Sequence, residues 1–225
     1  MYKLVSTALL LVSFSSQVNA QEIKQGILQA YWLPVWNDDG TQSTPHLKYR
    51  YIASVNGEKA DKVINIESND SELTLQNISH YFDKVPPNFV EFKEGHIERA
   101  GTISVAKMKG STECSHHYYE AELVAFTPLK DKTFNIDKLE KSAGCESYPY
   151  AVTYTLKEQA KDTHFKASPE DSAKDTGAIP MDSPLIKVKT VNAQWIQAAV
   201  YDESKPGLIG TPGGYVKMSY LQPVN

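Results

Sequence analysis

The amino-acid sequence predicts a mainly β fold, an antiparallel sheet arranged as a sandwich or a partly open barrel, with one or two short helices and one intrachain disulfide. Segments in which apolar residues alternate with period two outnumber helix-like segments by about eight to two. An Asn-Gly pair between two of these segments indicates a hairpin. The 225-residue chain contains only two cysteines, so a single bridge is the most that it can form.

The first twenty residues have the pattern of a secretory signal peptide. Lys3 supplies a positive charge, residues 4–14 are largely apolar, and Ala20 ends a short cleavage pattern of small residues. No cysteine follows the apolar run, so we expect simple cleavage without a lipid anchor. The apolar run is also shorter than the ~20 residues of a membrane-spanning helix. The sequence therefore predicts a periplasmic or secreted protein with signal peptide 1–20 and no transmembrane segment after cleavage.

Composition divides the rest of the chain into three parts. We expect a β-rich main module over residues 21–157, a polar loop or linker over 158–184, and a C-terminal β segment over 185–225. Charged residues, serine, alanine and proline dominate the middle part, where apolar residues are isolated. A segment of about forty residues is a poor independent domain, so we expect the C-terminal segment to pack on the main module.

The clearest local pattern is the hairpin predicted across residues 47–66. Apolar and polar residues alternate on both sides of Asn56-Gly57, and such a pair suits a two-residue turn in which both positions need positive φ. A loop of two residues would place Tyr49 opposite Ile64. One face of this hairpin would be largely apolar and would have to be covered.

Two segments have a period near 3.6 and predict helices. One covers residues 71–85 and ends before Pro86-Pro87, and a weaker one covers about 135–142, with Gly144 available to end it. Beyond the hairpin, the predicted strands cover residues 27–36, 89–92, 102–108, 116–126, 148–156, 185–191, 195–201 and 215–221.

Cys114 and Cys145 are the two cysteines. Disulfides persist in exported proteins, and two cysteines leave one possible connectivity, so we expect these residues to be bonded to each other. On the loop-entropy model the bridge would contribute roughly 3.5 kcal/mol. The alternative is two free thiols or a redox pair, but the Cys-x-x-Cys spacing of redox motifs is absent.

The charge balance disfavours polyanionic partners. The chain has 23 Lys and Arg against 27 Asp and Glu, a formal net charge of −4, and no run of five basic residues. Neutralising a phosphate backbone takes clustered Lys and Arg, so we expect no nucleic-acid partner. Electrostatic binding to anionic lipid is disfavoured for the same reason.

The densest polar cluster spans residues 113–122. If it is a strand, His116 shares a face with Glu120 and Glu122, and a zinc site there would need a further ligand from another segment. The spacing matches no specific metal motif, so we expect a solvated polar face and no cofactor. The chain also lacks the Gly-x-Ser-x-Gly elbow, and we assign no catalytic residue.

Trp32 and Trp36 are the candidate binding residues. They lie four positions apart on one predicted strand, and exposed aromatic faces stack on sugars or form the centres of protein interfaces. The alternative is that both fill the core of a β fold. The sequence favours an exported, non-catalytic protein that binds a protein or glycan partner through this aromatic surface or through an exposed sheet edge. The competing hypothesis is a secreted, possibly metal-assisted hydrolase centred on His116.

Overall fold

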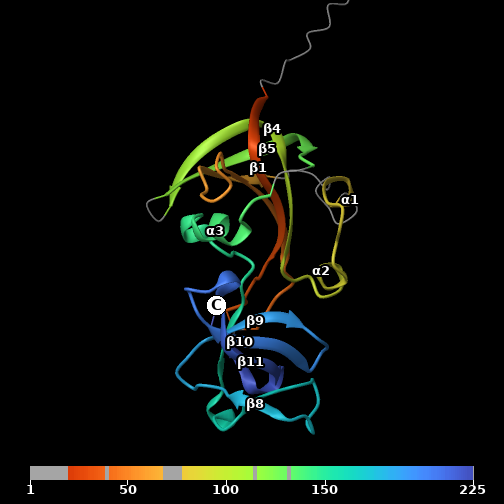
Figure 1. The fold of residues 1–225 in the computed structure, drawn as a ribbon, viewed down its shortest axis with the longest axis vertical. Helices are drawn as coiled ribbons and strands as arrows, with labels where there is room; N and C mark the ends of the chain where they lie inside the picture. Colours follow the sequence, from red (N-terminus) through yellow and green to blue (C-terminus); the bar gives the residue numbers. More distant parts are fainter. Residues whose placement is uncertain (1–19, 39–40, 68–77, 114–115, 131–132, 225) are drawn as a thin grey trace, which may run out of the picture.

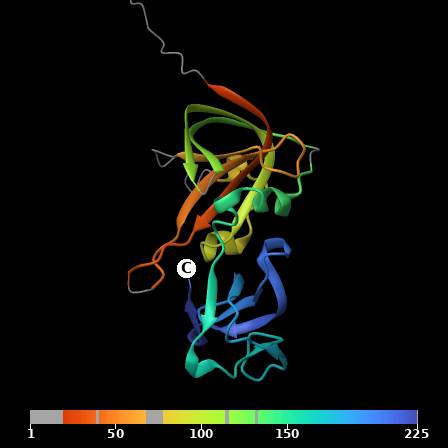
Figure 2. The ribbon, with the colours of Figure 1, turned by 90° about the vertical axis from the view of Figure 1, so that its left-hand side faces the viewer.

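Two groups of strands, each around its own core, make up the computed structural model, which describes residues 20–38, 41–67, 78–113, 116–130 and 133–224. Figure 1 shows a barrel formed by the N-terminal strands at one end of an elongated molecule and a curled sheet formed by the C-terminal strands at the other. Figure 2, turned by 90°, shows the barrel and the curled sheet stacked end to end.

The N-terminal group is a closed five-stranded barrel with the order β1-β2-β3-β5-β4. Its strands are β1 (Gln21–Leu33), β2 (His46–Ala53), β3 (Lys62–Glu67), β4 (His96–Glu113) and β5 (His116–Pro128). Neighbouring strands are antiparallel except β3 and β5, which run parallel. Period-two alternation points Leu28, Ala30 and Trp32 of β1 into the barrel core.

Two short helices between β3 and β4 pack on the barrel core. These are α1 (Ile78–Tyr81) and α2 (Pro87–Glu91), and Pro87 opens α2 at a position where a missing N–H costs nothing. Ile78 and Phe89 are buried in the same cluster as the inward-facing side chains of the strands.

A third helix covers the outer face of the barrel. In α3 (Ile136–Lys141), Asn135 is the N-cap, and its side chain accepts a hydrogen bond from the backbone N–H of Lys138 at 3.1 Å. Leu139 packs against Ile27 and Ile52, on the outside of β1 and β2. The following 3-10 turn η2 (Gly144–Glu146) continues along the same face.

The C-terminal group is a seven-stranded antiparallel sheet with the order β12-β6-β9-β10-β11-β7-β8. Its strands are β6 (Thr153–Leu156), β7 (His164–Lys166), β8 (Asp175–Ala178), β9 (Leu185–Thr190), β10 (Trp195–Tyr201), β11 (Ile209–Lys217) and β12 (Leu221–Pro223), with 3-10 turns η3 (Glu158–Ala160), η4 (Pro206–Leu208) and η5 (Met218–Tyr220). Its core contains Phe165, Leu185 and Val216. The segment 158–184 contributes β7 and β8, and the segment 185–225 contributes β9 to β12.

The chain is mainly β, but the predicted fold class is wrong in its details. The N-terminal barrel is closed, and its closure depends on the parallel pair β3 and β5, which an antiparallel fold does not contain. The described residues hold three short α-helices where one or two were expected. The pairing of β3 with β5 joins segments more than fifty residues apart, and the periodicity of a strand does not say which distant strand it joins.

The predicted disulfide is also wrong. Cys145, in η2, is an exposed free thiol whose Sγ lies 3.2 Å from the hydroxyl of Tyr118. Cys114 lies outside the described residues. A count of cysteines says which pair is available, whereas a bridge also needs their Cα atoms within about 7 Å and their Cβ atoms turned toward each other. In this fold the Cys145 thiol is directed to a tyrosine of β5.

The hairpin exists, but its register differs from the predicted one by two residues. Tyr49 lies opposite Ile66, where Ile64 was predicted, and the connection spans residues 54–61. A two-residue turn of the predicted type needs positive φ at both positions, but only Gly57 has it, at 77°. A shift of two keeps every side chain on its face, so the apolar face is preserved.

The loop of the hairpin is longer because its own side chains stabilise it. The Asn56 Oδ1 accepts hydrogen bonds from the backbone N–H groups of Glu58 and Lys59, at 2.9 and 3.1 Å. Ser54 donates to the carbonyl of Lys59 at 2.7 Å. These bonds satisfy the backbone of the loop without strand pairing.

The helix predictions are borne out in part. Helix α3 confirms the helix expected over 135–142. Of the helix expected over 71–85, residues 71–77 lie outside the described residues, and α1 is a single turn. The strand predicted at 89–92 is wrong, because Phe89 belongs to α2. None of the described helices is long and apolar enough to cross a membrane.

Candidate functional site

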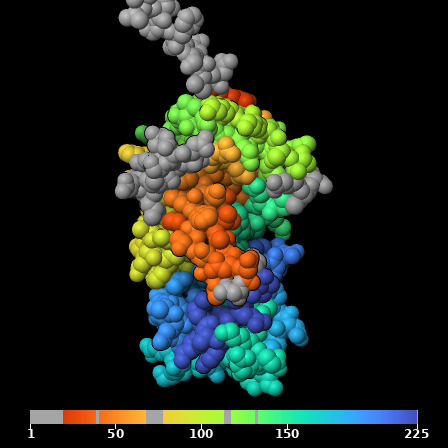
Figure 3. Space-filling view, turned by 180° about the vertical axis from the view of Figure 1, so that it is seen from behind, coloured from red at the N-terminus to blue at the C-terminus, as the bar shows by residue number. Residues whose placement is uncertain are grey.

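The junction between the two halves contains the segment that follows β1. Trp36 packs against the core of the C-terminal sheet, and its backbone forms an isolated bridge with Gln42. Figure 3 shows this segment, in orange, lying against the blue C-terminal strands. The chain therefore leaves the barrel after Leu33, contacts the second half, and returns to start β2.

The two tryptophans predicted to form one aromatic surface belong to different cores. Trp32 is 6% exposed, lies in the barrel core, and donates from Nε1 to the carbonyl of Phe89 at 2.7 Å. Trp36 is half-buried against the C-terminal sheet. The strand ends at Leu33, so the alternation that would place both on one face does not reach Trp36. Trp32 nevertheless lines the cleft described next.

A cleft of about 310 Å³ lies at the junction of the barrel and the sheet. Its polar and charged side chains come from both halves: Gln42, Ser43, Lys93 and Glu94 on the barrel side, and Lys187, Thr190 and Asn192 on the sheet side. Its aromatic lining consists of Trp32, Phe92, Tyr150 and Tyr154. Ligand sites commonly combine apolar walls with a few polar groups in this way, and they occur preferentially at domain junctions.

Glu94 is the main polar link between the two halves. It lies in the turn before β4, and its carboxylate accepts from the backbone N–H and the hydroxyl of Thr190 in β9, at 2.7 and 2.6 Å. It also forms an ion pair with Lys187 at 2.8 Å, in which both side chains are largely buried. Burial by itself would raise the pKa of the Glu94 carboxyl. The Lys187 charge and the hydrogen bonds from Lys187 and Thr190 outweigh burial and hold the pKa below its usual value.

The two residues that flank Glu94 in the sequence both have positive φ. Lys93 has φ of 49° and Gly95 has φ of 73°. The left-handed conformation costs a non-glycine residue about 1–2 kcal/mol, and strained backbone of this kind is concentrated at functional sites. The turn places the Lys93 ammonium 5.9 Å from the centre of the Trp32 ring, on the wall of the cleft.

Tyr154 of β6 brings a buried hydroxyl to the same cleft. Its side chain is 2% exposed, and its hydroxyl has no hydrogen-bond partner in the structure. Buried polar groups are nearly always paired, so an exception calls for an explanation. Burial, together with the nearby Glu94 charge, raises the pKa of Tyr154 to about 12. The hydroxyl therefore keeps its proton at neutral pH and is a buried donor without an acceptor in the structure.

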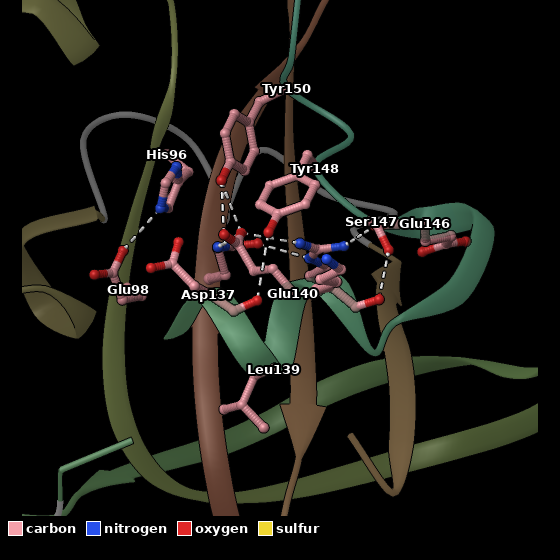
Figure 4. Close-up of polar contacts among 12 residues, drawn as sticks. His96, Glu98, Asp137, Leu139, Glu140, Glu146, Ser147, Tyr148 and Tyr150 are labelled. Atoms are coloured by element: carbon pink, nitrogen blue, oxygen red, sulfur yellow. Dashed lines mark hydrogen bonds and ion pairs between the residues drawn. The ribbon is translucent and has the colours of Figure 1, made fainter. Parts of the chain in front are cut away.

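Tyr150 connects the cleft to a buried polar network on the barrel (Figure 4). Its hydroxyl donates to the two carboxylate oxygens of Glu140 in α3, at 2.9 and 2.8 Å. Its ring stacks on His96 with centroids 4.1 Å apart. Burial and the Glu140 charge raise the pKa of Tyr150. The ring is thus held in a fixed position on the cleft wall.

The network behind Tyr150 is too deeply buried to act on a substrate. Arg50 is 0% exposed and pairs with Glu140, which is 2% exposed, at 3.3 Å. Gln29 accepts from the Arg50 Nε at 2.6 Å and donates to Glu140 at 2.7 Å. Arg50 also donates to the carbonyl of Glu146 in η2. These bonds hold α3 and η2 on the barrel, so the network is structural.

The alternative site centred on His116 has little support in the part of the chain that the structure describes. His116 begins β5, but its side chain lies outside the described part. Glu122, one of its strand-mates, is paired with Lys107 at 2.8 Å. His96 pairs with Glu98 at 3.3 Å, and its ring stacks on Tyr150. Within the described residues no three histidine, cysteine, aspartate or glutamate side chains form a group able to hold a metal ion.

Comparison of the chain with protein-family models, with curated proteins and with solved structures found no match. The cleft therefore has to be interpreted from its own chemistry. Lys93, Glu94 and Tyr154 were not singled out from the sequence. Gly95 indicates a turn at that point, but nothing in the sequence indicates that the turn meets β9, almost a hundred residues later.

Proposed function

We propose that this chain is an exported, non-catalytic protein that binds a glycan in the cleft between the barrel and the C-terminal sheet. The observation that carries the proposal is the composition of the cleft wall, which combines aromatic rings with hydroxyl, amide and charged groups from both halves. Sugar rings have apolar C–H faces, which suit aromatic surfaces, and hydroxyl edges, which need hydrogen-bond partners.

The size of the cleft favours a small ligand over a protein surface. A volume of about 310 Å³ is at the lower end of the range for ligand sites. A standard protein interface buries about 800 Å² on each partner, which requires a broad surface. The described large apolar residues that are well exposed, such as Val55, Val124 and Val188, belong to separate strands and loops. They offer no such surface.

Rigid walls further support a binding role. Glu94 and Thr190 fasten the two sides of the cleft to each other, and the Glu140 hydrogen bonds hold Tyr150. A site whose side chains are already held in place loses less conformational entropy when the ligand binds.

A glycan array probed with the purified protein tests the proposal. We expect retention of a limited set of glycans, and loss of that retention in the variant Ala193→Trp. Ala193 is an exposed residue on the rim of the cleft, so an indole there blocks the cleft without disturbing a core. Ala167→Trp is the matched control, because Ala167 is an exposed alanine that does not line the cleft. An array without retained glycans, or equal retention by both variants, contradicts the proposal.

A further inference from the structure

The described polar groups of the cleft include more free hydrogen-bond donors than free acceptors. Among the described residues that line it, Glu94 is the single carboxylate. Its oxygens already accept hydrogen bonds from the Thr190 backbone, the Thr190 hydroxyl and Lys187, all between 2.6 and 2.8 Å. A carboxylate has about four lone-pair positions, so little acceptor capacity is left for a ligand. The one anionic group among the described lining residues is thus occupied by the protein itself.

Several hydrogen-bond donors of the cleft, in contrast, have no acceptor among the described residues. The Lys93 ammonium forms no ion pair with a described carboxylate, and its closest described partner is the ring of Trp32. The Tyr154 hydroxyl has a proton and no acceptor. The Asn192 Oδ1 accepts hydrogen bonds from two backbone N–H groups, at 2.9 and 3.0 Å. The amide N–H₂ of the same side chain is therefore the group that can donate to a ligand.

The charges of the lining residues also favour an anionic ligand. Lys93 and Lys187 together outweigh Glu94 by one positive charge, although the whole chain has a formal net charge of −4. The cleft is therefore locally positive on an acidic protein. An anionic ligand gains from this local field, whereas a cationic one meets an ammonium group.

From this excess of donors and positive charge we infer that the ligand of the cleft is an acidic glycan, one with a uronic-acid or other carboxylate-bearing sugar. Its carboxylate pairs with the Lys93 ammonium and accepts from Tyr154 and Asn192. The inference rests on the proposed function, because it names the class of sugar that the same cleft binds. Lys93 is the residue that distinguishes acidic from neutral sugars.

Titration calorimetry with two matched disaccharides tests the inference. One ends in glucuronic acid and the other in glucose, so they differ only in a carboxylate against a hydroxymethyl group. We expect the acidic disaccharide to bind about tenfold or more tightly, as for a hydrogen bond to a charged group, and the difference to shrink as salt is raised. In Lys93→Met the two affinities should become equal. Lys109→Met, which removes an exposed lysine of β4 outside the cleft, should keep the tenfold preference.

The outcomes separate the inference from the proposed function. Equal binding of both disaccharides by the unchanged protein, tighter binding of the neutral one, or a preference that survives Lys93→Met overturns the acidic ligand and leaves glycan binding standing. No binding of either disaccharide, together with an array that retains nothing, overturns both. The affinity of Lys93→Met for the neutral disaccharide reports whether the variant is folded and its cleft intact.

Discussion

Arg50 and Glu140 show how much of this structure depends on single buried polar residues. Both are almost fully buried. The hydrogen bonds from Gln29 and Arg50 to Glu140 join α3 to the barrel strands, and the bond from Tyr150 ties the cleft wall to α3. Removing two charges from water is costly and is offset only when the pair is well bonded. The sequence gives no local sign of this pair, because its members are ninety positions apart.

The first prediction concerns Glu140. Glu140→Gln should lower the free energy of unfolding by about 3–5 kcal/mol, because it leaves the Arg50 guanidinium buried without a counter-charge. Chemical denaturation followed by circular dichroism measures the effect. Glu158→Gln, at an exposed glutamate, should change stability by less than about 0.5 kcal/mol. A small effect at Glu140 would show that water reaches the network.

The second prediction compares two tyrosines of the cleft wall. Tyr150→Phe should cost about 1–3 kcal/mol of stability, because it removes the donor to the buried Glu140 carboxylate. Tyr154→Phe should leave stability unchanged or slightly raised, because its hydroxyl has no partner to lose. The same Tyr154→Phe should weaken binding of an acidic glycan about tenfold, as for the loss of a hydrogen bond to a charged group. Chemical denaturation measures the stability of the two variants, and titration calorimetry measures their glycan binding. A large loss of stability in Tyr154→Phe would show that its hydroxyl has a hydrogen-bond partner in the free protein.

At the scale of elements, the sequence was most informative where the pattern is local. The hairpin around Asn56-Gly57 and the helix capped by Asn135 follow from residues within a few positions of each other. The register of the hairpin could not be predicted in the same way. The side chains of Ser54 and Asn56 form hydrogen bonds with the backbone of the loop, and these bonds stabilise a loop longer than two residues. The strand expected at 89–92 is also a local failure, since a run of two prolines opens a helix there instead.

The third prediction tests the loop of the hairpin. Gly57 has φ of 77°, and Gly57→Ala should lower the free energy of unfolding by about 1–2 kcal/mol, because an alanine in that conformation is strained. A Cβ added at Gly110 in β4 would meet its nearest atom at 3.6 Å, an ordinary van der Waals distance, and Gly110 has no positive φ, so Gly110→Ala should have little effect or stabilise slightly. Thermal or chemical unfolding of both variants measures the difference. Equal effects at the two positions would be inconsistent with the observed loop.

At the scale of the whole molecule, the organisation depends on contacts between distant segments. Two cores, a barrel closed by a parallel pair and a sheet that begins at Thr153, are joined through Glu94 and through the segment that contains Trp36. Alternation predicted that the chain is mainly β, but it carries no information about which strands pair at long range. Trp32 could be named as a candidate binding residue from its residue type alone. The residues that form the cleft around it could not, because long-range pairing brings them together.

The fourth prediction concerns the pH dependence of the link between the halves. The folded pKa of Glu94 lies below the ordinary value of about 4.3, so its contribution to stability is present above that pH and is lost as the pH falls through the folded pKa. Glu94→Gln should be less stable than the unchanged protein at pH 7, and this difference should shrink as the pH falls below about 4. Denaturation at a series of pH values measures it. A difference that is independent of pH would mean that Glu94 acts without its charge.

The central claim is that a glycan binds between the two halves, and hydrogen exchange on the bound protein tests it most directly. With the best array glycan at saturation, we predict slower amide exchange in two segments that are far apart in the sequence, residues 92–95 before β4 and residues 190–194 after β9. Peptides from the far end of the barrel, around Lys109, should exchange at unchanged rates. Protection confined to one half, or located away from both segments, would contradict the claim.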